Sequence, residues 1–365
     1  MAYTREDIEK WVETERYIRQ EDLHGLDLRH LCLSGVTFEE VNLSHTDLSG
    51  AILEECVFWN TDLTGALFHG ARLNDSGFYG VLLCGAQCSN ADFTNATFQE
   101  TDFTGADMKD TCLANAAIDK SLLARLDFAR AILARVTISQ SQVRFVNFTD
   151  ADLTRFSAPG CDLTQVLFER TNLTKAMLKD AKFKNRTFPE CTFVLTILDG
   201  ASLVSADLSG NDLSKASFAG ADLTGAIFSG ATGEFTSFIG AKAARADFSS
   251  VSFHMANFSE ADLSRSTFHG ASAPKSLFVK VHFEGAVLQG ADLRYADLSH
   301  ATVAGADFSY ADVSVANVHG VVMEDARWEK SNRKGLRITD EDLAEAERWQ
   351  SPLSKQLREQ GRKEP

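Results

Sequence analysis

A five-residue period runs through most of this chain. From Leu23 to Trp328, every fifth residue is Leu, Phe, Ile, Val, Met or Trp, with five exceptions: Cys88, Ala158, Gly233, Ala243 and Ala273. We call these positions centres. The residue two before a centre is mostly Ala, and 20 of the 24 Gly lie two residues after one. Such a repeat decides the fold class before any other feature is considered.

Neither regular secondary structure accommodates this period. In a helix, five residues at 3.6 per turn would scatter the centres around the axis. In a continuous strand, an odd spacing would place successive centres on opposite faces. A chain that turns a corner every five residues resolves the conflict. The centre and the residue two before it then both point inward, and the residue between them, often Asp or Asn, points outward.

The residues at the predicted corners agree with this interpretation. A type II turn favours Pro at its second position and Gly, with positive φ, at its third. Pro159, Pro189 and Pro274 each lie one residue after a centre, and Gly160 completes the pair at one of these corners.

The repeat resembles a known family. Residues 206–230 read ADLSG NDLSK ASFAG ADLTG AIFSG, which is similar to the A-(D/N)-L-x-x motif of pentapeptide-repeat proteins. The similarity covers residues 21–330 and implies an all-β solenoid, a right-handed quadrilateral β-helix with four five-residue sides in each coil. Stacked at about 4.8 Å, about 15 such coils would form a rod roughly 75 Å long. Two departures stand out. Phe156 is large where Ala is expected and is followed by the small centre Ala158, and residues 231–245 predict a local distortion because Phe235 occupies a corner there.

Both ends of the repeat predict helical caps, since a solenoid must cover its terminal coils. Residues 1–20 form the N-terminal cap, with a helix capped by Thr4 and an apolar stripe of Ile8, Trp11, Val12 and Ile18. Residues 331–365 form the C-terminal segment. A helix there begins near Thr339, carries Leu343, Ala346 and Trp349, and ends before Pro352. This segment either closes the last coil or pairs with a second copy as a homodimer.

Composition favours a non-catalytic cytoplasmic protein. The chain has no long apolar run, no signal-peptide pattern at its start, and an odd number of Cys, with Cys56, Cys161 and Cys191 at inward small-residue sites. Its nine His match no metal-ligand spacing, and no catalytic or nucleotide-binding motif occurs. Most Asp residues repeat in one solvated environment, which does not separate the pKa values of two carboxylates. We expect no enzyme activity, cofactor, metal, membrane or direct nucleic-acid binding.

One of the four predicted faces differs from the others. The face centred on Phe38, Phe58 and Phe78 has no Asp or Asn just before its centres until Asn257. Exposed apolar patches often mark partner sites, although β-branched and aromatic residues also suit any strand surface. The candidate protein-binding residues on this face are Val57, Trp59, Tyr79, Met177, Ile197, Ile239, Leu277 and Val279.

Charge is also unevenly distributed. Between Lys120 and Arg186 there are 12 basic and 6 acidic residues, whereas the rest of the repeat has 11 basic and 30 acidic. This basic band is the second candidate surface. Its members include Arg125, Arg130, Arg135, Lys182, Lys184 and Arg186.

Two function classes follow. The first is a protein-binding scaffold or adaptor, and the layout weakly resembles pentapeptide-repeat proteins encoded among bacterial type VI secretion components. The second is a mimic of duplex DNA that binds gyrase or topoisomerase IV, as quinolone-resistance members of the family do. The acidic faces and a C-terminal dimer favour the mimic, but the basic band interrupts its continuous acid. The sequence therefore favours the scaffold.

Overall fold

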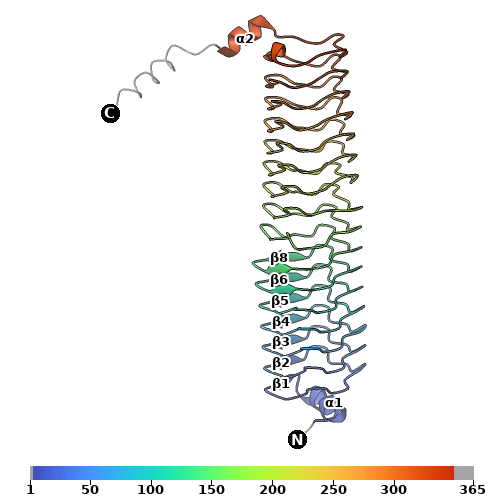
Figure 1. The fold of residues 1–365 in the computed structure, drawn as a ribbon. Coiled ribbons are helices and arrows are strands. Elements are labelled where there is room, and N and C mark those ends of the chain that lie inside the picture. The colour runs from blue at the N-terminus through green and yellow to red at the C-terminus, as the bar shows by residue number, and fades with distance from the viewer. Residues whose placement is uncertain (1–2, 349–365) are drawn as a thin grey trace, which may run out of the picture.

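The protein is a rod of stacked coils with a helix near each end (Figure 1). We describe residues 3–348 of a computed structural model. Each coil pairs in parallel with the next at one constant offset along the sequence, from Tyr17 with Thr37 at the start to Asn317 with Arg337 at the end. The chain is therefore a parallel β-solenoid, as the repeat predicts.

Among the described residues, continuous strands occur only in the first part of the rod. Seven short strands form one sheet, with all pairs parallel: β1 (Tyr17–Arg19), β2 (Thr37–Glu39), β3 (Val57–Trp59), β4 (Gly77–Tyr79), β5 (Thr97–Gln99), β6 (Ala117–Asp119) and β8 (Thr137–Ser139). A second sheet contains β7 (Leu122–Ala124) and β9 (Gln142–Arg144). Beyond Arg144, single bridges at the residue before each centre continue the same register.

Most corners adopt the predicted turn. At the corner after Leu23, the amide of Leu26 donates to the carbonyl of Leu23, and Gly25 between them has a φ of 68°. Most corners place a residue other than Gly in this left-handed region, for example Asp75 with a φ of 62°. That conformation costs an L-residue energy. It is retained because the same residue bonds to the next coil, as the Asp75 amide does to the Thr94 carbonyl at 2.9 Å.

The interior is filled by the centres and by the small residues two positions before them. Stacked Phe rings run along the axis. On one face they are Phe38, Phe58, Phe78 and Phe98, and further along Phe218, Phe238, Phe258 and Phe278, with neighbouring centroids 4.6–5.1 Å apart. On another face Phe228, Phe248 and Phe268 stack in the same way, with centroids 4.8 Å apart. Cys56, Cys88, Cys161 and Cys191 are buried as free thiols, and burial raises the pKa of Cys56 to about 12. The predicted core is confirmed.

The two departures from the repeat have different outcomes. Phe156 and Ala158 are both buried, so a large and a small residue have exchanged places as expected. The local distortion predicted for residues 231–245 is wrong, because the register continues through Thr232 and Lys242. Gly233 leaves room for the ring of Phe253 from the next coil, since a Cβ atom at Gly233 would lie 3.1 Å from that ring.

The N-terminal helix is shorter than the predicted cap. α1 spans Arg5–Thr14 and begins with a reciprocal capping box between Thr4 and Asp7. Its Ile8 is fully buried against the first coil. Ile18 is not part of this helix: it lies in β1 and points into the core, so the solenoid begins at Tyr17 and not at residue 21. The five-residue register already fits Ile18, which explains the difference.

Two short helices lie near the C-terminal end of the described chain. The 3-10 helix η1 covers Met323–Asp325, and the indole Nε1 of Trp328 donates to the Met323 carbonyl. α2 covers Glu341–Arg348, close to the predicted start, but none of its described residues is buried and Leu343 is 49% exposed. Trp349, Pro352 and the rest of the predicted tail to residue 365 lie outside the described residues, and so does the homodimer proposed through that tail.

The Phe ladder gives a direct test of the register. We expect Phe238→Ala and Phe258→Ala each to lower the free energy of unfolding by about 3–5 kcal/mol, because each removes a buried ring stacked between two others. Denaturant unfolding measures the change. Phe235→Ala is the matched control, since Phe235 is 49% exposed at a corner and should cost little. Equal effects at positions 235 and 238 would contradict the assignment of centres to the interior.

Candidate protein-binding surfaces

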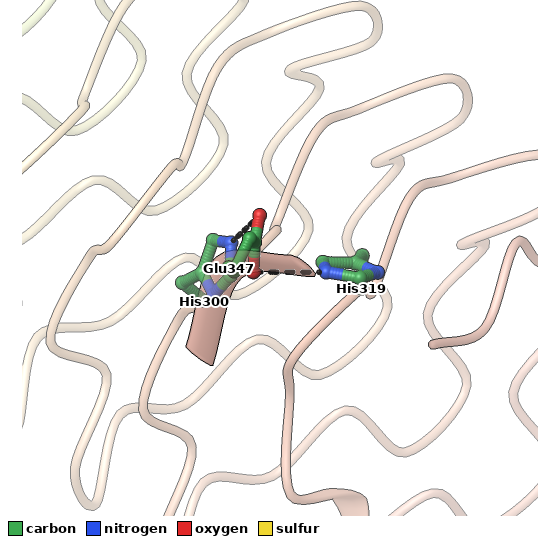
Figure 2. A group of neighbouring side chains, drawn as sticks. All are labelled: His300, His319 and Glu347. Atoms are coloured by element: carbon green, nitrogen blue, oxygen red, sulfur yellow. Dashed lines mark hydrogen bonds and ion pairs between the residues drawn. The ribbon is translucent and has the colours of Figure 1, made fainter. Parts of the chain in front are cut away.

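Three side chains that can ligate metals meet where α2 joins the last coils (Figure 2). Glu347 of α2 lies between two imidazoles, with Oε1 3.4 Å from Nε2 of His300 and Oε2 3.3 Å from Nε2 of His319. The spacing of the His residues in the sequence did not predict this group. The sequence feature that could have indicated it is that His300 and His319 fall on adjacent coils.

The surroundings of His319 favour a hydrogen-bonded contact between α2 and the last coils over a metal site. A metal-bound imidazole usually donates its second N–H to an acceptor. Here Nδ1 of His319 instead accepts a hydrogen bond from the amide of Asp340, at 3.2 Å. With Nδ1 acting as an acceptor, Nε2 is the ring nitrogen of His319 that can donate to Glu347. We conclude that this group attaches α2 to the solenoid.

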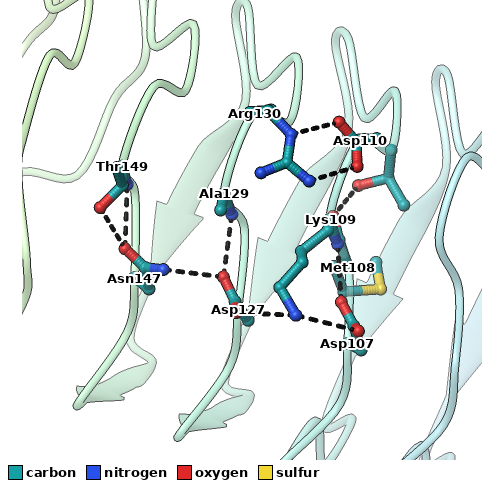
Figure 3. A network of polar contacts seen from close by, with 10 residues as sticks. Asp107, Met108, Lys109, Asp110, Asp127, Ala129, Arg130, Asn147 and Thr149 are labelled. Carbon is teal, nitrogen blue, oxygen red and sulfur yellow. Dashed lines mark hydrogen bonds and ion pairs between the residues drawn. The ribbon is translucent and has the colours of Figure 1, made fainter.

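The outer Asp and Asn residues serve the corners. In the commonest arrangement, the side-chain oxygen accepts a hydrogen bond from the amide two residues later, as Asp92 does from Thr94 at 2.9 Å. Such Asx turns are a known way for short polar side chains to stabilise turns. Some also bond along the rod: the side-chain amide of Asn147 donates to Asp127 in the preceding coil (Figure 3). The outer Asp and Asn residues thus take part in hydrogen bonds that support the backbone of the coils.

The predicted apolar face contains one well-built aromatic pair. Trp59 of β3 and Tyr79 of β4 are register partners, and their rings stack with centroids 4.3 Å apart and an interplanar angle of 19°. Trp59 is 46% exposed, and Tyr79 and Val57 are partly exposed. The Tyr79 ring lies over Gly77, where a Cβ atom would come within 2.6 Å of it. The absence of a side chain at Gly77 therefore leaves the space that the ring occupies.

A shallow hollow of about 230 Å³ adjoins this pair. Its lining combines the two aromatic rings with amide and carboxylate groups: Trp59, Asn60, Tyr79, Gly80, Gln99 and Glu100. Stacking of the two rings covers one face of each. The hollow offers an apolar anchor beside polar groups.

The other apolar candidates do not join the Trp59–Tyr79 pair. Met177 and Ile197 are partners on adjacent coils, with 51% and 40% of their surfaces exposed. Ile239, Leu277 and Val279 lie further along the rod. At about 4.8 Å per coil, roughly 24 Å separates Tyr79 from Met177. The structure thus divides the predicted patch into separate clusters on one face.

The basic band is not a single surface either. Arg125, Arg130 and Arg135 occupy three successive corners and therefore point in different directions. Lys182 and Lys184 flank the centre Phe183 on another side of the coil and are exposed. Arg186 takes an inward site normally filled by Ala, and its buried Nε has no hydrogen-bond partner among the described residues. Positive charge counted along the sequence is therefore dispersed around the rod.

Part of this charge is neutralised within the molecule. Along one corner, Arg130 pairs with Asp110 of the preceding coil at 2.7 Å, and Arg170 pairs with Asp150 at 2.6 Å (Figure 3 shows the first pair). Hydrogen bonds from the two guanidinium groups lower the pKa of Asp110 and of Asp150. These four residues form an ion-pair ladder in which acid and base alternate from one coil to the next. Arg130 is consequently less available to an external partner than the sequence suggests.

Comparison with known proteins agrees with the coil geometry. A model described as pentapeptide repeat region matches residues 31–108. A second, described as pentapeptide repeats (8 copies), matches residues 147–185, 190–232, 234–271, 275–303 and 286–325. The chain belongs to the pentapeptide-repeat family. No curated protein matches it.

Two solved pentapeptide-repeat structures are similar to this chain at low sequence identity. QnrB1, a plasmid-mediated fluoroquinolone resistance protein, is 18% identical with a TM-score of 0.39, over 51% of this chain and 91% of QnrB1. HetL, involved in regulating heterocyst differentiation in the cyanobacterium Nostoc, is also 18% identical, with a TM-score of 0.23 over 92% of this chain and 94% of HetL. At this similarity, neither indicates what the present protein binds.

The ion-pair ladder predicts a dependence of stability on pH. A carboxyl group whose pKa is lowered in the folded state stabilises the protein above its unfolded pKa, and this contribution is lost as pH falls through the lowered value. Arg130→Ala with Arg170→Ala should therefore lose less stability than wild type when pH falls from about 5 to about 2.

Thermal or urea unfolding at several pH values measures this effect. Lys175→Ala with Lys215→Ala is the control. It also removes two positive charges, but neither lysine has an ion-pair partner among the described residues. If the arginine variant and the control show the same acid sensitivity, the ladder does not operate in solution.

Proposed function

We propose that this pentapeptide-repeat protein is a non-catalytic scaffold that binds a protein partner, with Trp59 and Tyr79 as the main contact site. The observation that supports this most directly is the exposed aromatic stack on the continuous sheet of β3 and β4. Trp and Tyr are enriched among residues that dominate binding energy at interfaces.

The rigidity of the site adds to its suitability. Each ring is held by its stacking partner, Tyr79 also lies over Gly77, and the strands beneath pair on both sides. Binding to a site that is already ordered avoids much of the entropy cost of fixing side chains at an interface. The neighbouring Asn60, Gln99 and Glu100 supply hydrogen-bonding groups around the apolar anchor.

The outer carboxylates favour a scaffold over an enzyme. Many of them accept hydrogen bonds from backbone amides within the repeat, as Asp92, Asp262 and Asp297 do. These carboxylates therefore support the coils themselves and do not converge on a cleft.

In residues 3–348, no helix is long and apolar enough to span a membrane. As more specific hypotheses, we propose that the scaffold is cytoplasmic and that it has an adaptor or effector-loading role in type VI secretion.

Substitution of the aromatic pair tests the proposal. Trp59→Ala with Tyr79→Ala should leave the melting temperature nearly unchanged and weaken capture of the specific partner at least thirtyfold, since a lost hot spot typically costs about 2 kcal/mol or more. A pull-down from the native host identifies the partner, and titration calorimetry then measures its affinity.

The matched control is Ile132→Ala with Phe145→Ala, which removes two apolar side chains that are 47% and 58% exposed on other sides of the rod. The control should bind normally. If the aromatic variant binds normally while Lys182→Glu with Lys184→Glu does not, the basic residues form the site and the pair is only strand surface.

The alternative, mimicry of duplex DNA toward gyrase or topoisomerase IV, is supported by the net charge of −15 and by the repeated Asp on the outer faces. Against it, many of these carboxylates are bound to backbone amides, and basic corners interrupt the acid. We therefore expect the purified protein to leave gyrase supercoiling unaltered, with or without a quinolone. Inhibition or protection at submicromolar concentration would favour the mimic over the scaffold.

A further inference from the structure

One edge of the rod combines unpaired basic residues with exposed apolar ones. It consists of the same corner in ten successive coils, and we call it the corner ridge: Arg135, Arg155, Lys175, Leu195, Lys215, Phe235, Met255, Lys275, Tyr295 and Val315. All ten have positive φ and all are exposed. None is acidic, although acidic residues outnumber basic ones 51 to 36 in the whole chain.

The members of the ridge lie in line along the rod. Residues at the same position of successive coils are neighbours, as the pairing of Met177 with Ile197 beside the ridge shows. At about 4.8 Å per coil, the nine steps from Arg135 to Val315 span about 43 Å. Met177, Ile197 and Leu277, which are exposed on the adjoining face, widen its apolar part.

The charges of the ridge are not balanced within the molecule. None of its five basic side chains forms an ion pair in the described part of the chain, whereas Arg130 and Arg170, on the preceding corner, each pair with an Asp one coil away. Arg135, Arg155 and Lys175 follow one another directly, so like charges stand side by side. Such an arrangement is unfavourable unless anionic groups lie between or over them.

We propose that the corner ridge binds an acidic polypeptide segment of a partner protein, one that also carries apolar side chains. Carboxylates would pair with the unbalanced Arg and Lys, and apolar side chains would contact Leu195, Phe235 and Met255. A segment of about 13 extended residues covers the full length of about 43 Å. This inference deepens the proposed scaffold function and rests on it, but it concerns a different surface from the Trp59–Tyr79 site.

The flanks of the ridge favour a polypeptide over a membrane or a nucleic acid. Asp152, Asp212 and Asp292 lie three residues before members of the ridge, on the adjoining face, and none of them is buried. A bilayer of anionic lipid or a nucleic-acid duplex is broad enough to bring its negative charge against these carboxylates. A single peptide chain is narrow enough to follow the ridge without reaching them.

Fluorescence anisotropy tests the proposal with a defined probe. The probe is a fluorescein-labelled peptide of about 14 residues in which Glu alternates with Leu or Phe, a length that covers the ridge. Its counterpart carries Lys in place of Glu. The full-length protein should bind the Glu peptide, with affinity that falls as salt rises, and should not bind the Lys peptide.

Charge-reversal variants then locate the site. Lys175→Glu with Lys215→Glu should weaken binding of the Glu peptide about tenfold or more, and Phe235→Ser should weaken it without changing the melting temperature. Arg245→Glu with Arg265→Glu is the matched control: it makes the same change in net charge at exposed residues of a different corner, and should alter binding less than about twofold.

Three results would overturn the inference. They are failure of the Glu peptide to bind, an equal loss in the Arg245 and Arg265 control, and tighter binding to phosphatidylserine vesicles through the same lysines, which would assign the ridge to a membrane. The scaffold function is judged separately. If the peptide fails but a partner still depends on Trp59 and Tyr79, only the ridge assignment falls; if the peptide binds but no partner depends on that pair, only the first site falls.

Discussion

Every other feature of this protein depends on the hydrogen bonds between successive coils. Each coil bonds to the next through backbone groups at equivalent positions, and these bonds hold the corners in a left-handed conformation that L-residues otherwise avoid. Once the corners are fixed, the chain has only two kinds of position. Centres and small residues are enclosed, and everything else is presented on four outer faces and four edges.

This geometry converts sequence spacing into columns along the rod. The neighbours of a residue are those at the same position in the coils before and after it, so Trp59 stacks on Tyr79 and Arg130 pairs with Asp110. Neighbouring columns can therefore have opposite characters. One edge neutralises its own charges in the ion-pair ladder, while the corner ridge next to it leaves its basic side chains unpaired among the described residues. The functional information of a rod like this lies in such differences between columns.

The acidic residues of the repeat have a structural role that the sequence does not show directly. In sequence, recurring Asp suggests an acidic surface that a DNA-binding partner would recognise. In the structure, the same side chains accept hydrogen bonds from amides two residues later and support the turns. Net charge and surface charge are still negative, but the position of each carboxylate is dictated by its own corner. A regular acidic pattern in this fold is therefore explained by stability first.

The sequence by itself determined the solenoid, the inward centres and the left-handed corners, because a strict five-residue period admits hardly any other packing. It also paired Trp59 with Tyr79, since columns follow from counting by twenties. The prediction that Ile18 belongs to the terminal helix was wrong, although the five-residue period itself assigns this residue to the core.

Only the tertiary structure decided which charged side chains form pairs. Arg125, Arg130 and Arg135 form one band in sequence but point to different sides, and Arg186 turns inward. The group of His300, His319 and Glu347 likewise depends on how α2 folds back onto the last coils. Local spacing fixes backbone register, whereas the partner of a long charged side chain depends on the direction in which the backbone presents it.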